Sequence, residues 1–186
     1  MIQTSVKQIS TQYLELAQKY RQSQRFNKAL NALRISIKAY PKNAEAYNEL
    51  GLIYRKMGQS KEAIKAYQKV LRINQKSAHA MLNLGICFLY QGNEAQAIVW
   101  FKKAIKTKPR YAYAHFNLGS TYFDQTHYVL AIHHLEIARK LDPAFLASYE
   151  ILSMAYMILK EEAKAHAVFG EAEKIKRHAR LKYAAN

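Results

Sequence analysis

The chain has 186 residues, half of them hydrophobic, which is enough apolar material for a sizeable core and excludes a mainly disordered protein. Its 29 lysines and arginines outnumber its 13 aspartates and glutamates, and the net charge of +16 favours anionic partners such as nucleic acid, acidic protein or acidic lipid. A single cysteine, Cys87, excludes an internal disulfide framework.

The start of the chain predicts a helix and no targeting segment. Residues 1–10 lack the apolar run of a signal peptide, and no apolar stretch of 18 residues occurs, so we expect a soluble, cytoplasmic protein. Ile2, Val6 and Ile9 continue the spacing of the apolar residues that follow, which predicts a long first helix beginning near residue 3 to 5. The alternative is that they form the seam of an intermolecular coiled coil.

The chain repeats itself every 34 residues without insertion or deletion. We number the positions of each repeat as slots, counted from its first residue. The five predicted repeats are 10–43, 44–77, 78–111, 112–145 and 146–179.

Each repeat has small residues at two fixed slots and large residues around them. Slot 8 holds Ala17, Gly51, Gly85, Gly119 and Ser153. Slot 20 is always alanine, at Ala29, Ala63, Ala97, Ala131 and Ala165. Slot 24 is large, with Leu33, Tyr67, Phe101, Leu135 and Phe169. We infer that the small residues let two helices of one repeat approach closely, and that the large residues fill the space beside them.

This pattern predicts two helices in each repeat. The first helices are expected at 10–23, 44–57, 78–91, 112–125 and 146–159, and the second at 27–40, 61–74, 95–108, 129–142 and 163–183. Pro41, Pro109 and Pro143 end second helices, because proline lacks an N–H and has a fixed φ.

The spacing resembles the tetratricopeptide repeat, whose pattern is W-x2-L-G-x2-Y, A-x3-F, P over 34 residues. The match covers residues 10–179, with an extension of the first helix at 1–9 and a basic tail at 180–186. The resemblance implies an all-α fold, a right-handed superhelical α-solenoid of helix-turn-helix repeats in one contiguous domain. The departures from the family pattern are His115 in slot 4, Ser153 in slot 8, and Gln75 and Arg177 in place of the closing proline. They suggest local loosening, most of all at the ends of the second and fifth repeats.

In this family the first helices line a concave surface, and the resemblance implies that peptides bind there. Slots 2, 5, 6, 9, 12 and 13 are expected to project inward. They make the candidate groove residues Arg21, Asn48, Leu52, Arg55, His79, Leu82, Asn83, Ile86, Tyr90, Tyr113, Phe116, Asn117, Phe123, Met154 and Met157. The groove is therefore expected to change from basic and polar to aromatic and aliphatic along the chain, which predicts a ligand with apolar anchors, such as a peptide or amphipathic helix. The alternative is that Leu82, Ile86 and Phe116 only pack against the next first helix.

Some relatives grip the acidic C-terminus of chaperones with a two-carboxylate clamp, which needs asparagine in slot 9 of the first repeat. Slot 9 here reads Gln18, Leu52, Ile86, Ser120 and Met154. The sequence therefore does not support that clamp.

The second helices carry much of the positive charge. The candidate basic surface contains Lys65, Lys69, Arg72, Lys102, Lys103, Lys106, Arg139 and Lys140. Nucleic acid or an anionic membrane is the alternative partner for this surface, although such charge usually only faces solvent. Trp100 is the one exposed-looking aromatic residue beside it that is able to stack on bases.

No catalytic motif occurs. Phosphate-binding glycine loops, H-E-x-x-H and Cys-x-x-Cys are all missing, and the histidines lack partners at metal-ligand spacing, so we expect no enzyme, cofactor or metal. Cys87 is expected in the core. No separate polar helix follows the fifth repeat, so a second copy could cover an open C-terminal face. The sequence thus predicts a protein-interaction scaffold or adaptor.

Overall fold

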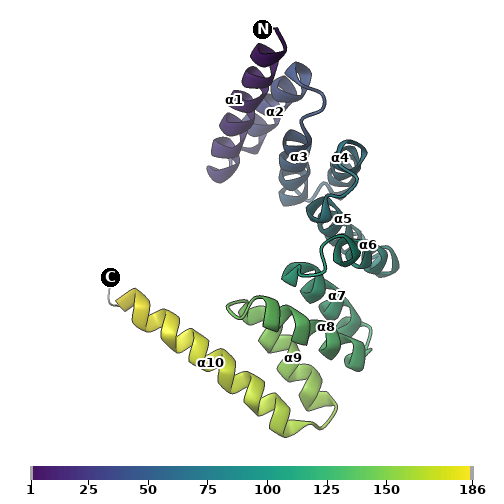
Figure 1. Ribbon diagram of the computed structural model, residues 1–186, viewed down its shortest axis with the longest axis vertical. Helices are drawn as coiled ribbons and strands as arrows, with labels where there is room; N and C mark the ends of the chain where they lie inside the picture. Colours follow the sequence, from purple (N-terminus) through teal and green to yellow (C-terminus); the bar gives the residue numbers. More distant parts are fainter. Residues whose placement is uncertain (1, 185–186) are drawn as a thin grey trace. The chain divides into compact units, whose positions relative to one another are not determined.

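The computed structural model describes residues 2–184, with side chains from 5 to 181. Met1 and residues 185–186, the outer ends of the predicted extension and basic tail, lie outside the described residues. The described chain is helical throughout, with the helices in antiparallel pairs (Figure 1). They are α1 (Ile2–Gln22), α2 (Phe26–Ala39), α3 (Ala44–Lys56), α4 (Ser60–Ile73), α5 (Ala78–Tyr90), α6 (Glu94–Thr107), α7 (Ala112–Asp124), α8 (Tyr128–Leu141), α9 (Leu146–Ile158) and α10 (Glu162–Ala184).

The helices follow the predicted repeat closely. Helices α3, α5, α7 and α9 begin at the predicted residue and end one residue early. Every second helix begins one residue before its predicted start. Helix α1 begins at Ile2, one residue before the predicted range of starts, and ends at Gln22, one residue early.

The chain divides into two compact units, unit 1 (Met1–Trp100) and unit 2 (Phe101–Asn186), with the boundary inside α6. The sequence predicted one contiguous domain. In unit 1, α2 packs on both α1 and α3, and α4 packs on both α3 and α5. In unit 2, α8 packs on α7 and α9, and α10 packs on α9.

The small residue of slot 8 is required by the packing of the two helices. A Cβ added at Gly51 would lie 2.6 Å from two ring carbons of Tyr67 in α4. A Cβ at Gly119 would lie 2.9 Å from Cγ of Leu135 and 3.1 Å from the carbonyl oxygen of Ala131 in α8. Slots 8, 20 and 24 therefore meet as the sequence predicted.

Slot 15 has a positive φ in all five repeats. The residues are Gln24 (58°), Gly58 (75°), Gly92 (71°), Thr126 (62°) and Lys160 (60°). The next residue donates its N–H to the carbonyl of slot 11, for example Gln59 to Tyr54 at 2.8 Å and His127 to Tyr122 at 2.9 Å. This is the Schellman arrangement that ends helices, so all five turns share one backbone geometry.

Slot 24 also packs against the first helix of the following repeat. Leu33 lies in one buried cluster with Ala46 and Ile53, which are slots 3 and 10 of α3. Tyr67 lies in a second cluster with Cys87, which is slot 10 of α5. The core of unit 1 therefore continues from one repeat into the next.

Candidate functional site

The predicted groove residues of unit 1 lie mostly at the surface of the first helices. Asn48, Leu52, Arg55, Asn83 and Ile86 are half-buried, and His79 and Tyr90 are exposed.

Leu82 does not lie at this surface, because only 6% of it is exposed. It packs inside unit 1, as the packing alternative described, and the prediction that it contacts a ligand is corrected.

Arg21 is bound within the protein. Its Nε donates to Oε2 of Glu49 at 2.7 Å, and the Glu49 side chain is only 8% exposed. The pair joins α1 to α3, so its first task is structural. Sequence reasoning missed Glu49, although an acid in slot 6 of α3 was a usable signal beside an arginine in slot 12 of α1.

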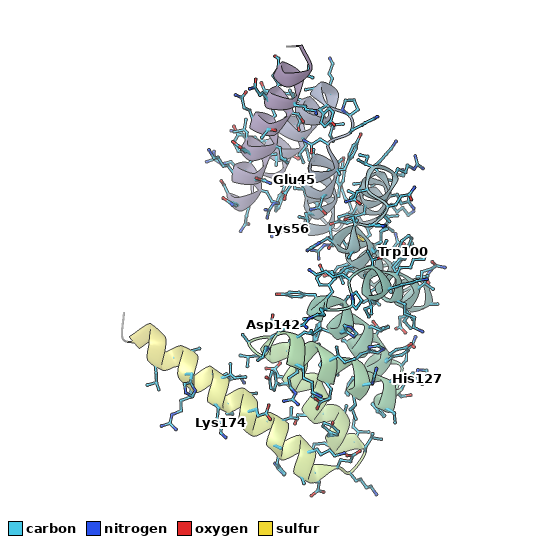
Figure 2. The ribbon with its side chains drawn as sticks, in the orientation of Figure 1. Glu45, Lys56, Trp100, His127, Asp142 and Lys174 are labelled. Carbon is cyan, nitrogen blue, oxygen red and sulfur yellow. The ribbon has the colours of Figure 1, made fainter. Side chains whose placement is uncertain are left out.

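Arg55 and Tyr90 line a shallow basic pocket in unit 1. The pocket has a volume of about 420 Å³ and is completed by Lys56, Gly58 and Ser60. Lys56 lies at the end of α3 (Figure 2), and Tyr90 is 68% exposed. An acidic group with an apolar neighbour fits this lining, because two cations stand beside an exposed ring.

Arg55 also reaches toward the interior. Its Nε and the hydroxyl of Tyr67 are buried without a hydrogen-bond partner among the described residues. Burial raises the pKa of Tyr67, and the positive charge of Arg55 partly offsets that rise. Burial likewise raises the pKa of Cys87 to about 11, with Arg55 again opposing it. Cys87 is fully buried, as the sequence predicted.

Unit 2 has an aromatic cluster made of Tyr111, Tyr113, Phe116 and Phe145. The Tyr113 and Phe145 ring centroids are 4.9 Å apart, and those of Phe116 and Phe145 are 4.7 Å apart. Tyr111 meets Tyr113 edge-on at 6.4 Å. Tyr113 is 49% exposed, whereas Tyr111 is buried. The cluster therefore holds an exposed ring in place by packing it against others.

Phe145 was missed by sequence reasoning. It precedes α9 at the turn from α8, so it occupies no first-helix slot, and no helical periodicity pointed to it. The turn brings its ring onto α7.

The other predicted groove residues of unit 2 differ in their surroundings. Asn117 donates its side-chain amide to the carbonyl of Tyr113 at 2.7 Å, within its own helix. Phe123 meets the ring of Tyr128 edge-on. Met154 and Met157 are 54% and 48% exposed.

A pair of histidines joins α7 to α8 in unit 2. His115 and His134 approach through their Nδ1 atoms at 3.1 Å, and His115 Nε2 lies 3.1 Å from the carbonyl oxygen of Pro109. His115 therefore donates from Nε2 to that oxygen and accepts at Nδ1 from His134. Burial lowers the pKa of both imidazoles, that of His134 to about 4. The neighbouring His115, then His133 and Lys102, add to the effect on His134.

The predicted basic surface is exposed except at Arg139. Lys65, Lys69, Arg72, Lys102, Lys103, Lys106 and Lys140 all have exposed side chains.

Arg139 is instead half-buried in an ion-pair network, which corrects its assignment to the basic surface. It donates to Glu136 at 2.7 Å and to Glu171, and it lies over the ring of Tyr149. These contacts join α8 to α9 and α10.

Trp100 is not the exposed aromatic residue that the sequence suggested. It lies on α6 (Figure 2), half-buried, and packs against the buried cluster that contains Tyr67 and Cys87. Its ring is therefore not presented to a base.

The described residues offer neither a metal site nor a membrane-spanning helix. They contain no group of three or more histidine, cysteine, aspartate or glutamate side chains placed to hold a metal ion. Within the same residues, no helix combines the length and apolar character needed to cross a bilayer.

Comparison with solved structures finds close matches to the fold. A crystal structure of MamA protein is 27% identical, with a TM-score of 0.76 over 94% of this chain and 95% of that one. The type IV pilus biogenesis factor PilW is 24% identical, with a TM-score of 0.80 over 91% of this chain and 79% of that one. PilF of Pseudomonas aeruginosa is 18% identical, with a TM-score of 0.84 over 91% and 78%.

No curated protein sequence matches the chain, but two family models do. One family model, described as tetratricopeptide repeat, matches residues 42–110, and another, described as TPR repeat, matches residues 17–58. Together with the paired helices and their shared turns, these matches place the chain in the tetratricopeptide repeat family of all-α proteins.

Proposed function

We propose that the chain is a protein-interaction scaffold that binds a peptide or helix of a partner on the exposed faces of its first helices. The aromatic cluster of unit 2 is the main anchor. The single observation that carries the proposal is Tyr113, which is about half exposed although its ring is held between two other aromatic side chains. We place this activity in the cytoplasm.

An exposed ring fixed by its neighbours is well suited to binding. Aromatic side chains dominate the energy of many interfaces, because they bury a large area at a low cost in conformational entropy. Packing of Tyr113 and Phe116 against Phe145 removes part of that cost before the partner arrives.

The basic pocket of unit 1 supports a partner with acidic residues. Arg55 and Lys56 supply positive charge beside the ring of Tyr90. The net charge of +16 would also speed the encounter with an acidic partner, an effect that weakens as salt rises.

The test is affinity capture from the native cell lysate after nuclease treatment, with washes at low and then moderate salt. We expect one or two defined proteins to survive the moderate-salt wash and to be lost with Tyr113→Ala and with Phe116→Ala. Val129→Ala is the matched control, because Val129 is 72% exposed on α8 and outside the cluster.

Two outcomes would contradict the proposal. Retention of the same proteins by both cluster variants, with circular dichroism unchanged, would remove the cluster from the site. Broad recovery that disappears with salt or nuclease would instead favour the exposed lysines, those of α4 in unit 1 or those of α6 in unit 2, as the contacts for nucleic acid or anionic lipid.

A further inference from the structure

Helix α4 carries a line of four cations on its outer face. Lys61, Lys65, Lys69 and Arg72 are spaced by four, four and three residues, so they lie in one line along the helix. All four are exposed. We call these four cations the α4 row. The buried residues of α4 lie on the opposite face and are Ala63, Ala66, Tyr67 and Val70.

The repeat pattern alone does not account for the α4 row, which occupies slots 18, 22, 26 and 29 of repeat 2. Slot 29 is basic in all five repeats, as expected for a cation near the C-terminus of a helix. Slots 18 and 22, by contrast, hold lysine only in α4. The other repeats have Asn27 and Asn31, Ala95 and Val99, Val129 and His133, and Ala163 and Ala167 at these slots. Lys61 and Lys65 are therefore particular to repeat 2.

The α4 row is unfavourable for the helix that carries it. Like charges three or four residues apart on a helix repel one another, and Lys61 also lies at the positive end of the helix dipole. Among the described residues, none of the four cations forms an ion pair. Glu62, the single acid of α4, lies at the edge of the row. An anion bound along the row would relieve a repulsion that the described part of the chain leaves in place.

The shape of the α4 row favours a linear polyanion over a flat surface. The row is about 17 Å long, with its cations about 6 Å apart along the helix, which is comparable to the separation of neighbouring phosphates on a nucleic-acid strand. It is also one helix wide, because slots 18 and 22 of α2 and of the part of α6 in unit 1 are uncharged. An anionic membrane would instead favour a wide basic face with apolar side chains that enter the lipid.

No aromatic side chain belongs to the α4 row. Tyr67, the aromatic residue of α4, is fully buried, and Trp100 packs half-buried against the same cluster. Proteins that hold single strands usually stack the bases on exposed aromatic rings. A duplex keeps its bases stacked on one another and presents a regular line of phosphates. The row therefore fits a duplex better than a single strand.

We propose that the α4 row binds the phosphate backbone of double-stranded nucleic acid, without preference for base sequence. Each cation neutralises one phosphate and releases the counterions condensed on it. The row lies in unit 1 and the aromatic cluster in unit 2, so this site does not rest on the proposed binding of a protein partner.

The experiment measures the fluorescence anisotropy of a labelled duplex DNA, about 20 base pairs long, with the full chain at several salt concentrations. The row variant is Lys65→Gln with Lys69→Gln. The control is Lys19→Gln with Lys140→Gln, which removes the same charge from exposed lysines of α1 and α8. The row variant should fold at least as stably as the parent, because it removes repelling neighbours, and thermal unfolding checks this.

Four phosphate contacts predict that log K falls with log salt with a slope of about −3.6, an affinity loss of about 150-fold between 50 and 200 mM salt. The row variant should reduce the steepness by about 1.8 and bind at least about tenfold more weakly at the lower salt. The control should keep the slope of the parent. A second duplex of different sequence should bind equally well, and a single strand of the same length more weakly.

Four results would overturn the proposal. The first is the absence of duplex binding at low salt. The second is an equal loss of affinity in the row variant and the control, which would show that only the net charge acts. The third is tighter binding of the single strand than of the duplex. The fourth is tighter binding of phosphatidylserine vesicles or polyglutamate that the row variant loses, which would assign the row to a membrane or to an acidic protein.

Discussion

Repeat 2 and repeat 4 have nearly the same backbone and different chemistry at matching slots. In repeat 2, slot 6 is the buried acid Glu49, paired with Arg21, and slot 24 is Tyr67. In repeat 4, slot 6 is Asn117, which bonds within its own helix, and slot 24 is Leu135. The 34-residue spacing thus fixes where side chains meet, while each repeat stabilises that meeting differently.

The largest difference is expected at slot 6. Arg21→Met should lower the free energy of unfolding of unit 1 by about 3 kcal/mol, because it leaves the Glu49 carboxylate buried without its partner. Asn117→Ala should change unit 2 by less than about 0.5 kcal/mol. Hydrogen exchange of α3 and α7, measured at increasing urea concentration, gives both changes in the free energy of unfolding. If Arg21→Met destabilised the protein no more than Asn117→Ala, the ion pair would add nothing to the contact between α1 and α3.

The histidine pair should make repeat 4 sensitive to pH. His115 and His134 have lowered pKa values in the folded state, so below pH 6.5 the unfolded chain binds more protons than the folded one. The contribution of the neutral pair to the free energy of unfolding is present above pH 6.5. It falls by roughly 2 kcal/mol as the pH drops toward 4.

The double variant His115→Tyr with His134→Ala places in repeat 4 the residues that repeat 2 has at these slots, Tyr47 and Ala66. Hydrogen exchange of α7 and α8 at pH 7 and pH 4.5 should show a smaller pH effect in this variant. An unchanged pH effect would assign the sensitivity to other groups.

The repeats differ in the side chain that faces slot 8. Gly51→Ala should destabilise unit 1 by about 1 to 2 kcal/mol, because the new methyl meets the buried ring of Tyr67. Gly51→Ala with Tyr67→Leu copies the pair Ala17 and Leu33 of repeat 1 and should recover part of the loss. Thermal unfolding gives both values, and a double variant less stable than the single one would contradict this explanation.

The smallest differences are expected at the turns. Gly58→Ala should cost about 1 kcal/mol, because alanine disfavours positive φ, and Thr126→Gly should gain a similar amount. Gly58 lines the basic pocket of unit 1, so both variants are compared by their stability without a partner. Opposite signs in chemical unfolding would support the shared geometry of the two turns. If Thr126→Gly destabilised, a contact of the threonine side chain would have to outweigh its backbone strain.

The fold could be predicted from the sequence because the repeat supplies the same evidence five times. Glycine or alanine in slot 8, alanine in slot 20 and a large residue in slot 24 located the helix pairs to within a residue or two. The exposure of the lysines of α4 and α6 could also be predicted, because they lie at second-helix positions outside the contact slots.

The interaction surfaces could be predicted only in part, because their neighbours come from other repeats and from turns. Phe145 belongs to a turn, so slots could not connect it with Tyr113 and Phe116. Arg139 and Leu82 were assigned to open surfaces from their slots. Arg139 instead forms ion pairs with Glu136 and Glu171, and Leu82 is buried. These outcomes depend on tertiary partners that helical spacing does not encode.

The burial of Cys87 has a practical consequence for labelling. It is the only cysteine of the chain, it is fully inside unit 1, and at neutral pH its thiol stays protonated because its pKa is raised to about 11. Maleimides and related reagents attack the accessible thiolate. A single cysteine introduced on an exposed helix face will therefore take up a fluorophore or spin label selectively, with the native residue left in place.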